Sequence, residues 1–127
     1  MGNHIGTPRK VLLIATGGTI ACRETENGLA PVLDGESLLR ELPELASVCD
    51  TEVLDLMQRD STDITAADRM QMARAVWERR GEYDGFVIAH GTDTLACTAA
   101  LLHHLLPGID RPVVVTGSML PMGADGS

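Results

Sequence analysis

The stretch from Tyr83 to Leu106 constrains the fold of this chain more than any other. Phe86-Val87-Ile88-Ala89 is a short continuous apolar run, as expected for a parallel strand that is covered on both faces. Gly91 then permits a sharp turn, and Thr92, Asp93 or both can cap the apolar helix that follows. The stretch therefore predicts a strand whose carboxyl end carries hydroxyls and a carboxylate, which is the edge where open α/β sheets bind ligands.

The same alternation of apolar runs and helical periodicity extends along the chain. It predicts strands near residues 10–15, 52–57, 85–90 and 112–116, and helices near residues 36–42, 65–80 and 93–106. This order implies parallel strands joined by right-handed crossovers. We therefore expect one α/β domain over residues 1–127, with a three-layer, doubly wound, mainly parallel sheet of the flavodoxin or Rossmann-like kind.

The predicted helix over residues 65–80 has both a start signal and a candidate buried face. Thr65 and Asp68 resemble a capping box, with Asp68 in place of the usual Glu. The residues expected to face the core follow at helical spacing: Ala66, Met70, Ala73 and Trp77.

Residues 22–33 differ in composition from the segments around them. They are polar and interrupted by Gly28 and Pro31, which predicts a loop. Long loops in compact domains often serve as lids, and we expect this one to be the least ordered internal segment.

Hydroxyl side chains follow the carboxyl end of every predicted strand. They are Thr16 and Thr19, Ser61 and Thr62, Thr92 and Thr94, and Thr116 and Ser118. Because the carboxyl ends of parallel strands meet at one edge of a sheet, these turns predict a hydroxyl-lined pocket for a small polar ligand. The alternative is an inert scaffold in which Gly17-Gly18 is a plain turn.

Composition argues against several classes of partner. A net charge of −8 and only three aromatic residues are unsuited to nucleic acid, which needs clustered Lys and Arg and stacking platforms. No apolar run approaches the roughly 20 residues of a membrane span. The three cysteines, Cys22, Cys49 and Cys97, are odd in number, and their spacing matches neither a zinc site nor a disulfide framework. We therefore expect free thiols in a reducing compartment and a cytoplasmic protein.

The sequence also lacks the usual cofactor motifs. Neither a Walker A loop nor G-x-G-x-x-G occurs, which leaves nucleotide binding as a minor alternative, and no cofactor is expected. His103 and His104 are adjacent on a helix and point in different directions, so no metal site is expected. His90 could act as a base to Ser61 or Ser118 with Asp93 orienting it, or it could be structural.

Three motifs together carry a resemblance to a known family. They are T-G-G-T-I-A at 16–21, D-G-F-V-I-A-H-G-T-D-T at 84–94 and R-P-V-V-V-T-G-S-M-L-P at 111–121. In this order and spacing the chain resembles the N-terminal domain of the asparaginase/glutaminase family of bacterial L-asparaginases. The resemblance implies hydrolysis of L-asparagine, or of L-glutamine, to the acid and ammonia through an acyl-threonine intermediate.

The resemblance also implies a role for several residues by position. Thr19 matches the nucleophilic threonine, and Thr92 matches the second catalytic threonine. Asp93 matches the carboxylate that binds the α-amino group of the substrate and acts together with Thr92. Ser61 and Thr62 match the turn that holds the α-carboxylate, and Ser118 lies where the family places a residue near the side-chain amide.

Two departures from the family pattern bear on activity. The family presents a lid tyrosine beside the nucleophile, but residues 22–33 contain none. The family also uses a lysine beyond the matched segment, whereas Lys10 is the only lysine here and precedes the first strand.

We therefore expect residues 1–127 to be an incomplete N-terminal domain, without the family's C-terminal domain, inactive alone and homo-oligomeric in complete form. The alternative is a non-catalytic remnant or split half that binds a small amino acid or a complementing partner chain.

Overall fold

The computed structural model describes residues 9–18, 22–31 and 34–120. The strands are β1 (Lys10–Ala15), β2 (Cys22–Thr25), β3 (Gly28–Pro31), β4 (Asp50–Asp55), β5 (Gly85–Ala89) and β6 (Val113–Thr116). The helices are α1 (Gly35–Arg40), α2 (Ala66–Arg79) and α3 (Leu95–Leu105), with 3₁₀ turns η2 (Pro43–Ser47) and η3 (Ser61–Asp63).

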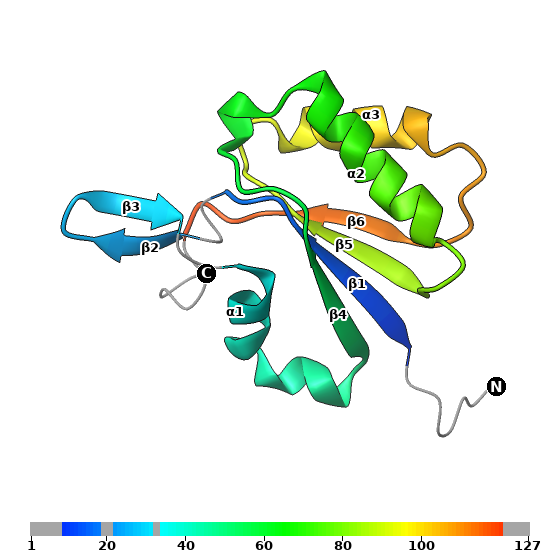
Figure 1. Ribbon diagram of the computed structural model, residues 1–127, viewed down its shortest axis with the longest axis horizontal. Coiled ribbons are helices and arrows are strands. Elements are labelled where there is room, and N and C mark those ends of the chain that lie inside the picture. The colour runs from blue at the N-terminus through cyan, green and yellow to red at the C-terminus, as the bar shows by residue number, and fades with distance from the viewer. Residues whose placement is uncertain (1–8, 19–21, 32–33, 121–127) are drawn as a thin grey trace.

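Four strands form a parallel sheet in the order β4-β1-β5-β6. The helices α2 and α3 lie on one face of this sheet and α1 lies on the other, which makes three layers (Figure 1). Helical crossovers return the chain to the same end of the sheet, so that every strand runs in one direction. The predicted α/β fold with a doubly wound parallel sheet is confirmed.

The main core lies between the sheet and the α2–α3 layer. Ile14 of β1 and Ile88 of β5 are fully buried, as are Met72 and Val76 of α2. Helix α1 covers the opposite face of β1, which explains why this strand reads as a continuous apolar run.

The predicted core face of α2 is wrong for three of its four residues, because Ala66, Met70 and Trp77 are exposed and only Ala73 is buried. Met70 and Trp77 are 48% and 39% exposed, and Met72 and Val76 face the sheet instead. Apolar residues occur on several sides of this helix, so the periodicity alone leaves its rotation open. The exposed Trp77 ring is covered by the Arg80 guanidinium, which lies 3.9 Å from its centroid.

Strand and helix boundaries differ from prediction around β4. The strand begins two residues earlier than predicted because its register follows β1, from Lys10 beside Asp50 to Ala15 beside Asp55. Before it, α1 ends at Arg40 and Pro43 begins η2, which was not predicted.

The predicted loop over residues 22–33 is a β-hairpin where the structure describes it. β2 and β3 pair antiparallel, with Thr25 opposite Gly28, and stand apart from the main sheet (Figure 1). The loop between the two strands is Glu26-Asn27, and the polar composition of the segment indicated a loop rather than paired strands. A role as a lid stays a prediction.

Candidate active site

The turns after the four parallel strands lie together at one edge of the sheet. Gly17 follows β1 with φ of 107°, and a Cβ atom there would lie 2.7 Å from the backbone of Arg59, which follows β4. The Arg59 N–H donates to the Thr16 carbonyl at 2.9 Å. The first two turns are therefore joined by direct backbone contact that only glycine allows.

The turns after β5 and β6 pack against the first two turns in the same way. Gly18 has φ of 91°, and a Cβ atom there would lie 2.6 Å from the backbone nitrogen of Gly91. A Cβ atom at Gly91 would meet Ser61, and one at Gly117 would meet the His90 carbonyl. The predicted convergence of the four turns is thus present in the structure.

Ser61 links the second turn to the third. It is 2% exposed, and its Oγ accepts a hydrogen bond from the Asp93 N–H at 3.0 Å. Its carbonyl accepts from the Thr94 hydroxyl at 2.7 Å. Asp60 caps this turn by accepting from the Thr62 N–H, which lowers the pKa of Asp60.

Thr92 and Asp93 do not cap α3, contrary to prediction. The N-cap residue is Thr94, and its hydroxyl is directed to Ser61 rather than to the helix. Asp93 is exposed, and its carboxylate makes no hydrogen bond or ion pair with residues of the described ranges. Thr92 is half-buried beside it.

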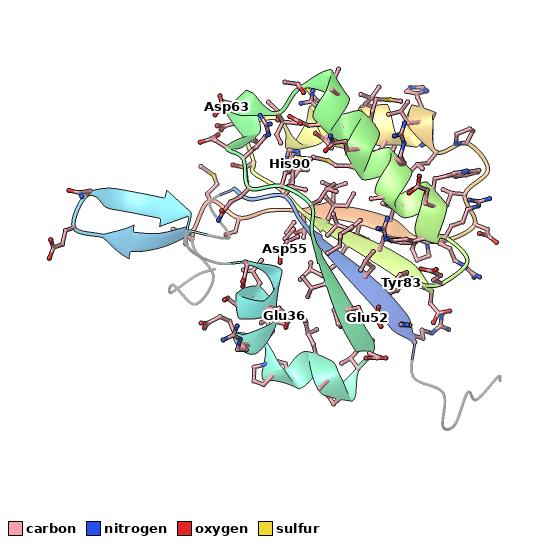
Figure 2. The ribbon with its side chains drawn as sticks, in the orientation of Figure 1. Glu36, Glu52, Asp55, Asp63, Tyr83 and His90 are labelled. Carbon is pink, nitrogen blue, oxygen red and sulfur yellow. The ribbon has the colours of Figure 1, made fainter. Side chains whose placement is uncertain are left out.

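His90 is fully buried, and both of its ring nitrogens are engaged elsewhere (Figure 2). Nδ1 lies 2.6 Å from the Gly91 carbonyl, and Nε2 lies 2.9 Å from the Thr98 hydroxyl of α3. Neither nitrogen contacts Ser61 or Ser118, so the structural reading of His90 is correct and the serine–histidine alternative is wrong.

The remaining site candidates are distributed as follows. Ser118 is half-buried and accepts from the Leu120 N–H at 3.1 Å, while Thr62 is exposed and donates to Asp60. Thr16 is buried and donates to the Ala89 carbonyl, which makes it structural. Thr19 lies outside the described residues.

A hollow of about 350 Å³ opens beside Gly17. Its polar lining includes Asp34, Asp55 and Gln58. Both carboxylates already accept backbone N–H groups of α1, from Ser37 and Gly35 respectively. Among the described residues, no group of three His, Cys, Asp or Glu could hold a metal ion, and no helix is long and apolar enough to cross a membrane.

Lys10 lies at the other end of the sheet, as predicted. Its Nζ is 3.0 Å from Glu52, and Glu52 also accepts from the Tyr83 hydroxyl at 2.5 Å (Figure 2). This cluster ties the starts of β1, β4 and the chain before β5 together. Lys10 is separated from the turn after β1 by roughly 17 Å, the rise of the strand.

The sequence interpretation missed two residues behind the site, Thr98 and Arg69. Arg69 Nε donates to the Thr98 hydroxyl at 2.8 Å, and that hydroxyl contacts His90. A threonine within the apolar helix L-A-C-T-A-A-L-L was the available signal, because a buried hydroxyl requires partners.

Known proteins are similar to this chain in both sequence and fold. Residues 10–127 match the family described as Asparaginase, N-terminal. The L-asparaginase of Thermococcus kodakarensis is 42% identical over 118 residues, which cover 89% of this chain and 35% of that protein. L-asparaginase 1 of Escherichia coli (strain K12) is 38% identical over 122 residues, covering 90% and 35%.

A solved structure extends the comparison to the fold. L-asparaginase I from Vibrio cholerae superposes with a TM-score of 0.84 and 31% identity, covering 95% of this chain and 37% of that one. The chain thus spans about a third of the length of the relatives it matches. On the family match over residues 10–127, the chain belongs to the asparaginase family.

Proposed function

We propose that this chain carries the threonine site of an enzyme that hydrolyses L-asparagine to L-aspartate and ammonia. One observation supports this most: the turns holding Ser61, Thr92 and Asp93 meet the Gly17-Gly18 turn, which leads directly to Thr19. Hydroxyls and backbone N–H groups suit the carboxylate of an amino acid, and an aspartate carboxylate such as that of Asp93 suits its ammonium.

In this proposal Thr19 is the nucleophile. Its hydroxyl oxygen attacks the side-chain amide carbon while a base takes its proton, and the C–N bond then breaks and releases ammonia. Water cleaves the resulting acyl-threonine ester to give L-aspartate. Backbone N–H groups of the glycine turns stabilise the oxyanion, and Thr92 with Asp93 supplies the second part of the catalytic unit.

Substrate recognition is assigned to the neighbouring turns. Asp93 pairs with the α-ammonium, and Ser61 with Thr62 holds the α-carboxylate. Ser118 lies on the turn after β6, whose Gly117 packs on His90, and we place it near the side-chain amide. L-glutamine is a further candidate substrate, and the complete protein is proposed to be a homo-oligomer.

A cytoplasmic location is also part of the proposal. It is supported by Cys49 and Cys97, which are free thiols in the structure.

The activity test requires more polypeptide than these 127 residues, because the matched relatives are about three times as long. We define the extended protein as this chain fused to the segment that follows the matched region in the Thermococcus kodakarensis L-asparaginase. The extended protein should release ammonia from L-asparagine, and the 127-residue chain should release little. The reason is that proton transfer to a positioned base contributes roughly 10²- to 10⁴-fold, and Lys10 is too far away to serve.

Substitutions in the extended protein test the assigned roles. Thr19→Val and Thr92→Val should each lower kcat by roughly 10³-fold or more with the fold intact, because each removes a hydroxyl but little volume. Asp93→Asn should raise KM by about 10- to 100-fold through loss of a charge-assisted hydrogen bond. Near-normal turnover by Thr19→Val would contradict the nucleophile, and an inactive extended protein would favour the non-catalytic binding alternative.

A further inference from the structure

A chain of hydrogen bonds runs from the surface of α2 to the turn that carries Thr92 and Asp93. It passes from Arg69 Nε to the Thr98 hydroxyl at 2.8 Å, from that hydroxyl to His90 Nε2 at 2.9 Å, and from His90 Nδ1 to the Gly91 carbonyl at 2.6 Å. His90 and Thr98 are both fully buried. The reaction proposed above uses none of these side chains.

For a neutral His90 ring, the chemistry at the two ends of this chain determines the direction of every hydrogen bond. The Gly91 carbonyl can only accept, so the proton must lie on His90 Nδ1. At the other end the Arg69 guanidinium can only donate, so the Thr98 oxygen accepts from it. The proton of Thr98 then points to Nε2, which accepts it in the neutral ring.

At the Gly91 end of this chain, a small displacement of the backbone would change the position of the proposed site residues. Gly91 packs so closely that a Cβ atom on it would clash with Ser61, and a Cβ atom on Gly18 would clash with the Gly91 backbone. The next two residues are Thr92 and Asp93, and the Asp93 N–H is held by Ser61. A shift of the Gly91 carbonyl would therefore move both proposed site residues.

The first turns of α2 also reach the second turn of the site. Asp68, the residue before Arg69, lies 3.6 Å from the Arg59 guanidinium. The backbone of Arg59 packs on Gly17. Two adjacent residues of one helix are thus connected to two different turns of the site.

We propose that Arg69, Thr98 and His90 form a positioning network that holds His90 as the Nδ1–H tautomer and thereby sets the orientation of the Gly91–Asp93 turn. The role in catalysis rests on the proposed asparaginase function, whereas the hydrogen-bond network itself does not. Arg69 is the half-buried end of the network on α2, and Gly91 is the end at the proposed site.

The first experiment is NMR on the 127-residue chain with labelled histidine. Long-range ¹H–¹⁵N spectra should show His90 protonated on Nδ1 and not on Nε2, and the opposite tautomer would overturn the proposal. Arg69→Met should shift the Nε2 resonance and the amide resonances of Gly91, Thr92 and Asp93. The matched control is Arg74→Met, which removes an exposed arginine from the same helix. If the two variants left these resonances equally unchanged, Arg69 would not be part of the network.

The second experiment measures turnover in the extended protein. Thr98→Val keeps the side-chain volume but removes the hydroxyl, and it should lower kcat/KM by up to about 10²-fold, the cost of a misplacement near 1 Å. Thr98→Ser removes a buried methyl group but keeps the hydroxyl, and it should retain activity within about 3-fold despite lower thermal stability. A purely structural role would make activity follow thermal stability, and that result would overturn the proposal. If the unsubstituted extended protein were inactive, the proposed function would fail and the NMR result would decide the network alone.

Discussion

The Ser61 hydroxyl joins two turns of the site, because its oxygen accepts the hydrogen bond of the Asp93 N–H. Removing it in Ser61→Ala leaves the Asp93 N–H without its acceptor, at a cost of about 1–3 kcal/mol in the free energy of unfolding. Urea denaturation of the 127-residue chain measures this difference. Thr62→Ala is the control, since Thr62 is exposed and should change the free energy of unfolding by about 0.5 kcal/mol or less. Equal effects of the two variants would contradict the linking role of Ser61.

Gly18 is the second residue at which one atom decides whether the turns can meet. In Gly18→Ala the new Cβ would lie 2.6 Å from Gly91 at a φ of 91°, so we expect a loss of more than about 2 kcal/mol from overlap and backbone strain. Gly81→Ala provides the comparison, because nothing lies within 4 Å of its Cβ position. That variant should be neutral or more stable by about 0.4–1 kcal/mol. Thermal unfolding of both proteins would show whether the effect belongs to the contact or to glycine replacement in general.

At the scale of single elements, α2 has the most specific start in the chain. Thr65 accepts from the Asp68 N–H at 3.1 Å, and the Asp68 carboxylate accepts from the Thr65 N–H at 2.9 Å, which confirms the predicted capping box. The Thr65 N–H lowers the pKa of Asp68, and the Arg59 and Arg69 charges act in the same direction. The helix that carries Arg69 is therefore anchored by an ionised carboxylate.

This capping box makes the stability of α2 depend on pH. A carboxylate whose pKa is lowered by folding stabilises the protein above its unfolded pKa, and this contribution is lost as the pH falls through the folded value. Asp68→Asn should therefore be less stable than the unsubstituted chain near neutral pH, and the difference should shrink as the pH falls below about 4. Urea denaturation across this range tests it, with the exposed Glu78→Gln on the same helix as the control. A difference that stayed constant with pH would show that the carboxylate charge is not responsible.

On the scale of the whole molecule, the sheet leaves β6 as an edge strand. Val114 on this strand is 52% exposed, and a hollow of about 300 Å³ opens between α3 and β6. Its apolar lining residues are Ala99, Leu102, Leu106, Ile109, Val113 and Val115. An exposed strand edge beside apolar surface favours pairing with another chain.

We therefore expect the 127-residue chain to self-associate in solution. Val114→Lys should reduce the association, because a charge on an edge strand opposes edge-to-edge pairing. Sedimentation over a range of protein concentrations measures it. Val48→Lys is the matched control, since Val48 is 73% exposed but follows η2 rather than lying on a strand. An equal reduction by both variants would point to general surface hydrophobicity.

What the sequence determined by itself was local and repetitive. Each parallel strand is a short apolar run ended by a polar turn, and this pattern identified the four strands, the α/β class and the edge where the turns meet. The start of α2 was equally readable, because a capping box depends only on residues three positions apart. The three motifs also pointed to the asparaginase family, to which the matched segment belongs.

Only the tertiary structure decided which side chains pack against, or hydrogen-bond to, another element. The rotation of α2 depends on the sheet beneath it, so Met72 rather than Met70 is buried. Thr94 donates to the Ser61 carbonyl instead of capping its helix, and the sequence of the helix cannot show this because Ser61 lies 33 residues earlier in the chain. His90 is bound by Thr98 and the Gly91 carbonyl rather than facing a serine, because α3 packs its hydroxyl against the ring. Such contacts join residues that the periodicity of a single segment cannot relate, since each depends on the relative placement of two elements.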